Sequence, residues 1–297
     1  MSKTIEKTGS TKSMDKYNLP LAEQIVKEAQ LREALGPLST RASIFCTDDC
    51  LNRFLRARNW NVKKAEKMLR ETLKWRASYK PEEITWDEVA HEAETGKLYR
   101  GKFADKEGRS VIIMRPANQN TNDPAKQVRL LVHSLENAVL NLPAGQEQMV
   151  WLVDFKKWTI RQAFAISTAR EIVYVFQTMY PERLKFAIVY DAPWLFERFW
   201  VAIKTFLDSE TFKKVKFVYT KKPESLKVVE ELFDMNDLEV ALGGRNTFVY
   251  NHEECSKQMK VDDAKTAQYW KLDGVAKASS MKLDAQDKEL SSKENGI

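Results

Sequence analysis

The sequence is poor in the residues that most enzymes use to make and break bonds. Its 297 residues include only three histidines, His91, His133 and His252. Nucleophilic catalysis pairs Ser, Cys or Thr with a base, and that base is most often His. His133 lies among apolar positions of an expected helix, which favours a hydrogen-bonded structural role. The sequence therefore predicts that the protein is not an enzyme.

Motifs that hold phosphates or metals are also missing. No G-x-x-x-x-G-K-[ST] loop, G-x-G-x-x-G turn or G-x-S-x-G elbow occurs in the sequence. The pair Gly243-Gly244 stands alone and favours a turn. His, Cys, Asp and Glu do not gather at the spacing of metal ligands. We expect neither a metal site nor a cofactor.

Cysteines and long apolar runs are scarce as well. Cys46, Cys50 and Cys255 form no C-x-x-C pair, which favours free thiols in a reducing compartment. The longest apolar run is far short of the ~20 residues that a membrane-spanning helix needs. The N-terminus shows no basic segment followed by an apolar one, as a secretory signal would. These features predict a cytoplasmic location with peripheral, transient membrane association.

Basic residues exceed acidic ones. Lys and Arg number 48 and Asp and Glu 42, which gives a formal net charge of +6. This excess favours acidic partners, either nucleic acid or an anionic membrane. The aromatic residues fall on apolar faces and do not interleave with a basic stripe, which argues against nucleic acid. Anionic membrane surfaces are therefore the expected partner.

The pattern of apolar residues changes along the chain. Three amphipathic helical segments lie between Leu21 and Lys80, and Thr47 is a plausible N-cap of the second. Beyond them, short apolar runs such as "VWLV" and "FAIVY" alternate with helical segments. Apolar residues at both parities fit strands that are buried on both faces. We predict an α/β fold with a mostly parallel sheet flanked by helices, plus an N-terminal helical subdomain.

The segment "APWLFERFWVAIKTFLD" carries a wide apolar stripe. An ordinary core helix explains the spacing on its own. The alternative is a movable wall over an apolar cavity, which touches a ligand when closed and a membrane when open. The residues assigned to this gate helix and its cavity are Trp194, Phe196, Phe199, Trp200, Ile203 and Phe206.

At this point the chain resembles the CRAL-TRIO family, and within it the phosphatidylinositol transfer proteins of the eukaryotic secretory pathway. The resemblance lies in "LNRFLRARNWNVKKAEKML", "VDFKKW", "YPERLKFAIVYDAPWLFERFWVAIKTFLD" and "LGGRNTF", in that order. It implies a sheet-floored lipid cavity with a mobile gate helix. The expected divisions are a disordered leader (1–16), a helical subdomain (17–86), a lipid-binding domain (87–256), an extension (257–271) and a disordered tail (272–297).

The resemblance also implies a headgroup site. The second Arg of F-L-R-A-R is Arg58, Y-P-E-R supplies Glu182 and Arg183, and the Lys after F-L-D is Lys214, with Lys213 as a register rival. Cations can neutralise the phosphate of phosphatidylinositol, and a carboxylate can accept hydrogen bonds from inositol hydroxyls. Arg183 could instead be purely structural.

Departures from the family pattern concern phosphatidylcholine. Family members that carry it have small hydroxyl residues on one strand and a Tyr on another. Here Met149, Trp151 and Ile112 occupy those strands. Bulky apolar groups cannot hydrogen-bond a phosphate, so we expect phosphatidylcholine binding to be weak or lost.

Two other functions remain open from the sequence. One is a carrier of a different apolar ligand, such as a sterol, a tocopherol-like molecule or a retinoid. The other is a lipid-loaded sensor that presents its ligand to phosphoinositide kinases or recruits them.

Overall fold

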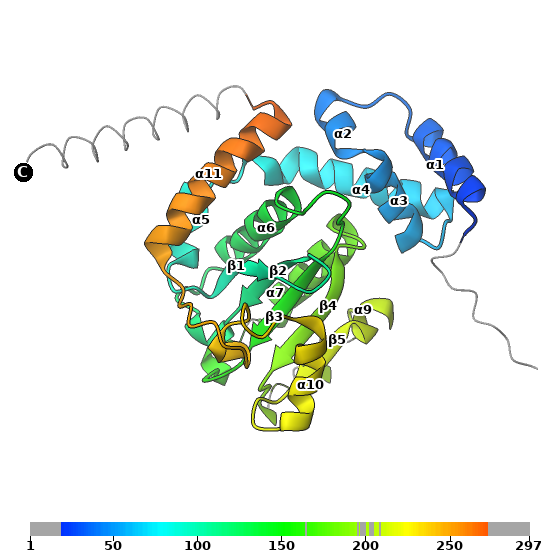
Figure 1. Cartoon of the computed structure of the whole chain (residues 1–297). Helices are drawn as coiled ribbons and strands as arrows, with labels where there is room; N and C mark the ends of the chain where they lie inside the picture. Colours follow the sequence, from blue (N-terminus) through cyan, green and yellow to red (C-terminus); the bar gives the residue numbers. More distant parts are fainter. Residues whose placement is uncertain are drawn as a thin grey trace, which may run out of the picture. The chain divides into compact units, whose positions relative to one another are not determined.

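The protein is described by a computed structural model, in which the chain divides into two compact units, residues 1–73 and 74–297 (Figure 1). The boundary falls within one helix, α4 (Val62–Tyr79), and each unit is described by itself. The residues that the structure describes are 19–163, 165–194, 196, 200–201, 205–207 and 209–272.

The first unit is helical. It contains α1 (Leu21–Leu35), α2 (Thr40–Phe45), α3 (Asp48–Ala57) and the start of α4. The expected N-cap is confirmed, because Thr47 Oγ1 accepts a hydrogen bond of 3.3 Å from the Cys50 N–H. Apolar side chains from three of these helices form its core, among them Leu31, Leu51, Phe54, Leu55 and Leu69.

The second unit is built on a five-stranded sheet. Its strands are β1 (Leu98–Ala104), β2 (Ser110–Met114), β3 (Met149–Asp154), β4 (Leu184–Tyr190) and β5 (Val215–Val218), in that spatial order. β1 pairs antiparallel with β2, and the other pairs are parallel. The predicted α/β class and mostly parallel sheet are confirmed.

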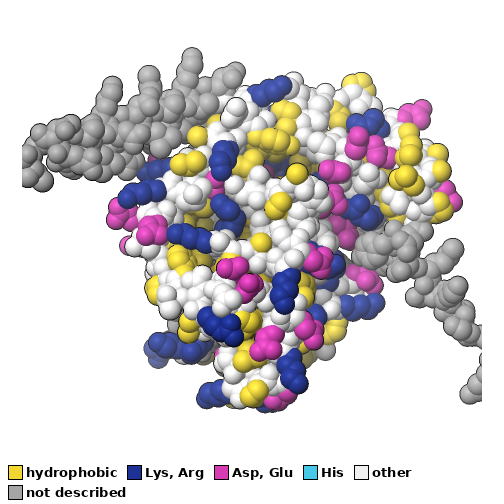
Figure 2. Space-filling model, in the orientation of Figure 1, with side chains coloured by type: hydrophobic (Ala, Val, Ile, Leu, Met, Phe, Trp, Pro, Cys, Tyr) yellow, Lys and Arg dark blue, Asp and Glu magenta, His cyan; other side chains and the backbone are white. Residues whose placement is uncertain are grey.

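Helices connect the strands and cover the sheet (Figure 1). Basic and acidic side chains are interspersed on the face that Figure 2 shows. The helical elements of this unit are η1 (Pro81–Glu83), α5 (Trp86–Ala93), η2 (Pro116–Asn118), α6 (Pro124–Leu140), η3 (Ile160–Gln162), α7 (Ile166–Tyr174), the π-helical η4 (Val175–Met179), α9 (Ser209–Lys213), α10 (Pro223–Leu232), η5 (Val240–Leu242) and α11 (His252–Trp270). Asp123 caps α6 by accepting from the Ala125 N–H at 3.0 Å, with Pro124 at its first position.

The side chains of successive strand residues pack into two separate cores, one on each face of the sheet. Ile112 and Trp151 pack with α6 and η4 on one face of the sheet. Val150 and Ile188 pack with α10 on the other. Because side chains alternate along a strand, this division explains why the strands are apolar at both parities.

A buried charged cluster fixes the chain just before β4. The Glu136 carboxylate accepts hydrogen bonds from Arg76 Nη1 at 2.7 Å and from the Tyr180 hydroxyl at 2.6 Å. Arg76 also pairs with Glu82 at 3.1 Å. Burial by itself would raise the pKa of Glu136, but the charge and hydrogen bonds of Arg76 and the Tyr180 hydrogen bond outweigh it and lower that pKa. The cluster ties α4 and α6 to the turn that follows Tyr180.

Replacing Glu136 with Gln should lower the free energy of unfolding at neutral pH by about 3 kcal/mol, because it leaves the buried Arg76 charge without its closest partner. The folded-state pKa of Glu136 lies below its ordinary value of 4.5. Its stabilisation is therefore present above pH 4.5 and lost as the pH falls through the folded-state pKa.

Urea unfolding of the wild type and of Glu136→Gln, from pH 7 down to acidic pH, measures this effect. The two curves of free energy against pH should approach each other below pH 4.5 and meet below the folded-state pKa of Glu136. A difference that stays constant across the whole range would contradict the assignment of charge to Glu136.

Candidate functional site

An apolar pocket of about 230 Å³ lies against one face of the sheet in the second unit. The strand register explains its floor, because Met114, Val153 and Val189 are aligned across β2, β3 and β4. Trp151, Ala187 and Val215 form the next aligned row, across β3, β4 and β5. The pocket's other side is formed by Ile172, Val173 and Phe176 from α7 and η4, by Phe155 and Trp158 after β3, and by Phe196 and Trp200.

Two of the predicted gate residues close this pocket. Phe196 is buried and its ring lies 4.2 Å from that of Phe155, while the Trp200 ring lies 5.7 Å from that of Phe217. Both residues are helical. Trp194 instead points outward, with 70% of its surface exposed. This segment therefore has one side exposed to solvent and another side that lines the pocket.

The end of the predicted gate segment contacts η4 and α7. The Phe206 carbonyl accepts a hydrogen bond of 2.9 Å from Gln177, and the Arg170 guanidinium lies 4.6 Å from the centre of the Phe206 ring. Phe206 does not line the pocket within the part of the chain that the structure describes. Phe199 and Ile203 lie outside the described residues.

The pocket is smaller than a two-chain lipid. Its volume of about 230 Å³ is below the range of about 300–1,000 Å³ that is typical of small-molecule sites, and a diacyl lipid is larger than a typical small molecule. Carrying a whole phospholipid requires the pocket to widen.

Only one of the three residues assigned to the altered phosphatidylcholine site reaches the pocket. Trp151 lines it and packs edge-on against Phe176, with ring centres 4.9 Å apart. Its indole N–H has no hydrogen-bond partner within the described chain. Met149 and Ile112 are fully buried in the core beside it. Of these three residues, Trp151 is therefore the one that occupies volume on the pocket floor.

Glu182 and Lys214 lie together at the edge of the sheet. The Lys214 Nζ and the nearer Glu182 oxygen are 3.9 Å apart, and their side chains are 20% and 14% exposed. This is an ion pair but is too long for a hydrogen bond. Glu182 has a left-handed φ of 59° two residues before the start of β4, and the Lys214 carbonyl accepts from the Ala187 N–H. The parallel pairing of β4 and β5 thus brings the two charges together.

Arg183 lies next to this pair but has a structural contact of its own. Its Nη1 donates a hydrogen bond of 2.8 Å to the carbonyl of Glu147, and its own carbonyl accepts from the Met149 N–H. Its charge also contributes to lowering the pKa of Glu136. Arg183 therefore links the start of β4 to the start of β3.

Arg58 lies in the first unit, at the C-terminal end of α3. Its Nη1 donates to the carbonyl of Ala57 at 2.9 Å. Glu182, Arg183 and Lys214 lie in the second unit. The structure thus brings Glu182 and Lys214 together and describes Arg58 in a separate unit.

No described helix is both long enough and apolar enough to cross a bilayer. No group of three or more His, Cys, Asp or Glu side chains in the same residues could hold a metal ion.

Comparison with known proteins identifies the domains. Residues 93–244 match the CRAL/TRIO domain, and residues 20–71 match the CRAL/TRIO N-terminal domain. The chain is 32% identical over 271 residues to phosphatidylinositol transfer protein PDR17 of Saccharomyces cerevisiae, covering 86% of this chain and 75% of that protein.

Other relatives extend the comparison. A CRAL-TRIO domain-containing protein of Schizosaccharomyces pombe is 33% identical over 241 residues, which are 81% of this chain but only 22% of that longer protein. The solved structure of Sfh5 superimposes with a TM-score of 0.61 and 16% identity, covering 80% of this chain and 92% of that one. At that identity the superposition shows a shared fold alone. By its two matched domains and its identity to PDR17, the chain belongs to the CRAL-TRIO lipid-binding family.

Proposed function

We propose that this protein binds phosphatidylinositol in an apolar cavity, closes a gate over its acyl chains, and exchanges or presents the lipid at membranes. The observation that carries the proposal is the largely buried pair of Glu182 and Lys214 in a chain related to a phosphatidylinositol transfer protein. The proposal assigns no covalent chemistry to the protein.

The Glu182–Lys214 pair suits an inositol phosphate headgroup. At 3.9 Å the two groups do not hydrogen-bond each other, and neither side chain has another hydrogen bond within the part of the chain that the structure describes. The ammonium can therefore donate to a phosphate, and the carboxylate can accept from ring hydroxyls. Because both groups are largely buried, such hydrogen bonds are worth more than those of an exposed ion pair.

The two arginines take different parts in the proposal. Arg58 is assigned to the phosphate by the family pattern alone, and the structure describes it by itself in the first unit. Arg183 acts mainly by holding the turn, because its guanidinium donates to the Glu147 carbonyl. That bond and the bond between Tyr180 and Glu136 hold the chain on both sides of Glu182.

The acyl chains need the space beneath the gate. Burying a methylene is worth ~0.8 kcal/mol, so a lipid with about 30 apolar carbons faces a barrier of roughly 20 kcal/mol to passage through water. A closed apolar cavity removes most of that barrier. Since the present pocket is smaller than a two-chain lipid, we propose that the segment from Trp194 to Phe206 moves outward when lipid enters.

The surface around the gate fits contact with an anionic membrane. Trp194 and Val201 are 70% and 54% exposed, and Ile160 on η3 is 56% exposed. Exposed cations accompany them at Lys157 and Arg170. Each Lys or Arg close to an anionic surface contributes about 1 kcal/mol of attraction, and exposed aromatic groups suit the interfacial region. This surface would hold the protein at the membrane during exchange.

The Glu182–Lys214 pair also weighs against one alternative. A sterol, retinoid or tocopherol-like ligand would give this largely buried ion pair nothing to bind. Presentation of the lipid to a phosphoinositide kinase uses the same site. The two outcomes differ only in where the bound lipid goes, and kinase stimulation compared with vesicle-to-vesicle transfer separates them.

Replacing Lys214 with Ala should weaken phosphatidylinositol binding about 10- to 100-fold, since it removes a charge-assisted hydrogen bond worth about 1.5–3 kcal/mol. Transfer of labelled phosphatidylinositol between vesicles measures the effect. The matched control is Lys213→Ala, because Lys213 is the exposed neighbour and pairs with Glu210 on the surface at 3.0 Å. The control should retain transfer.

Equal transfer by the two variants would refute the headgroup assignment. A selective loss in Lys213→Ala would shift the site by one residue, against the geometry in which Lys214 is the partner of Glu182. Thermal unfolding of each variant verifies that the protein is still folded.

The wild-type protein should also extract inositol lipid from mixed vesicles in large excess over phosphatidylcholine. Trp151→Thr should raise the bound fraction of phosphatidylcholine, because it frees volume on the pocket floor and adds a hydroxyl. Trp151→Phe is the control, since it keeps an aromatic ring without a hydroxyl. Mass spectrometry of the extracted lipids measures the ratio, and abundant phosphatidylcholine with no inositol lipid in the wild type would exclude the proposed selectivity.

A further inference from the structure

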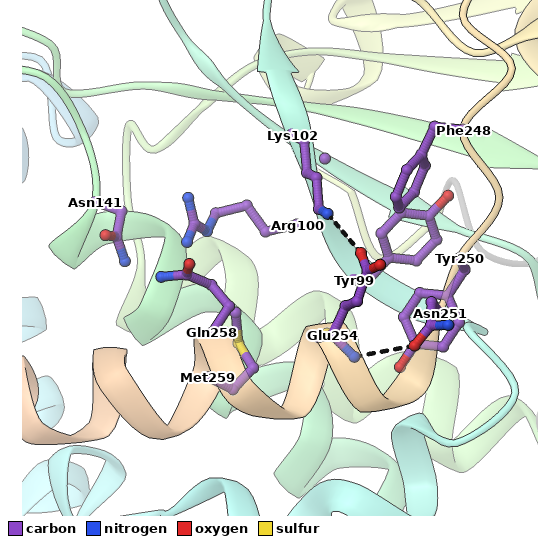
Figure 3. A pocket seen from close by; sticks show the side chains of 12 residues that line it. Tyr99, Arg100, Lys102, Asn141, Phe248, Tyr250, Asn251, Glu254, Gln258 and Met259 are labelled. Atoms are coloured by element: carbon purple, nitrogen blue, oxygen red, sulfur yellow. Dashed lines mark hydrogen bonds and ion pairs between the residues drawn. The ribbon is translucent and has the colours of Figure 1, made fainter. Parts of the chain in front are cut away.

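A second pocket, larger than the first, lies between the edge strand β1 and helix α11. Its volume is about 440 Å³. This falls within the range of about 300–1,000 Å³ that is typical of small-molecule sites. It shares no lining residue with the apolar pocket under the gate. Figure 3 shows that its side chains divide into a polar end, around Arg100, Asn141 and Gln258, and an aromatic end around Phe248.

Arg100 is held in place at the polar end. Its Nε donates to Asn137 at 2.9 Å, and its Nη2 donates to the fully buried carboxylate of Asp262 at 2.8 Å. Its Nη1 has no hydrogen bond within the described residues. A guanidinium fixed by two bonds with a further donor group left over is preorganised for an anion.

The polar end also carries an excess positive charge. Asp262 faces two cations, Arg100 and Lys265, each at 2.8 Å. Burial by itself would raise the pKa of Asp262, but the hydrogen bonds from Lys265 and Asn137 and the charge of Arg100 lower it, so the carboxylate stays ionised at neutral pH. One anion thus balances two cations, which leaves the cluster with one positive charge.

The aromatic end provides flat apolar surface. The Tyr99 ring lies 5.0 Å from that of Tyr250 and 6.5 Å from that of Phe248. Lys102 lies over the Phe248 ring, with its Nζ 5.0 Å from the ring centre. Lys102 pairs with Glu254 at 3.0 Å, and the two charges cancel each other. Both side chains are 60% exposed, so this ion pair is weak. When the exposed Lys102 side chain moves off the Phe248 ring, a ring system can pack here with its anionic group directed to Arg100.

We propose that this pocket is a second ligand site, for a small amphiphile that has a flat aromatic body and a single anionic group. Stacking on Phe248 and Tyr250 would hold the body, and Arg100 would bind the anion. The site is independent of the phosphatidylinositol site, because its lining comes from β1, α11, the residues that precede α11, and Asn141 at the end of α6.

Calorimetry on the whole chain tests the proposal with 2-naphthoate, which has two fused rings and one carboxylate. We expect one binding site with a Kd of about 10–100 μM, the affinity range of ligands of this size. The neutral analogue 2-naphthylmethanol should bind at least about 10-fold more weakly, because it lacks the charge that pairs with Arg100.

Variants locate the probe. Arg100→Gln and Phe248→Ala should each weaken 2-naphthoate binding about 10-fold. The control Lys260→Gln removes a partly exposed cation that pairs with Asp87 outside the pocket, and it should bind normally. Lys214→Ala should also bind normally, so that failure of this proposal and failure of the lipid proposal give different results.

Cys255 supplies a readout that does not depend on the folding of any variant. It lines the pocket and is partly exposed, whereas Cys46 and Cys50 are buried. Burial raises the pKa of the Cys255 thiol, so alkylation is followed at mildly alkaline pH. Bound 2-naphthoate should slow alkylation of Cys255 at least about 5-fold, and 2-naphthylmethanol at the same concentration should not.

Three results would overturn the proposal. One is the absence of saturable 2-naphthoate binding. Another is equal affinity for the acid and the alcohol. The third is binding that leaves the alkylation of Cys255 unchanged, which would place the probe elsewhere in the molecule.

Discussion

The second unit depends on the alternation of apolar side chains along strands that are covered on both faces. Every second residue of β3 and β4 packs toward α10, and the others face α6, α7 and the gate segment. The face toward α10 is filled by side chains such as Phe233. The opposite face is filled near β1 but leaves an apolar pocket over β3 and β4. A cavity for lipid tails therefore needs no special floor, because it uses sheet surface that helices would otherwise cover.

Much of the fold follows from local patterns in the sequence. The apolar strands β3 and β4 and the N-cap at Thr47 correspond to predicted elements. Helix α11 has no predicted counterpart, for a physical reason. It buries few apolar side chains and also buries the charged Asp262, whose partners lie on α6 and β1. No periodicity of apolar residues can reveal a helix that is held by distant polar contacts.

The candidate site was less accessible to sequence reasoning. The pairing of Glu182 with Lys214 was suggested only by family resemblance, because their proximity results from the parallel alignment of β4 and β5. The cluster around Glu136 was missed altogether. Its members are separated by 60 and 44 positions, and the one available signal was a carboxylate next to apolar residues of α6. The modest volume of the pocket follows from the positions of the Trp151 and Phe196 rings, which sequence does not fix.

The central claim is that the interior of this CRAL-TRIO chain is occupied by one diacyl inositol lipid. Native mass spectrometry of the full chain, purified from eukaryotic cells without detergent, measures this occupant directly. The account predicts a single adduct with the mass of a phosphatidylinositol, which is released on unfolding and confirmed by fragmentation to inositol phosphate. A protein that carries no adduct, even after incubation with vesicles that contain phosphatidylinositol, or one that carries only a neutral apolar molecule, would contradict it.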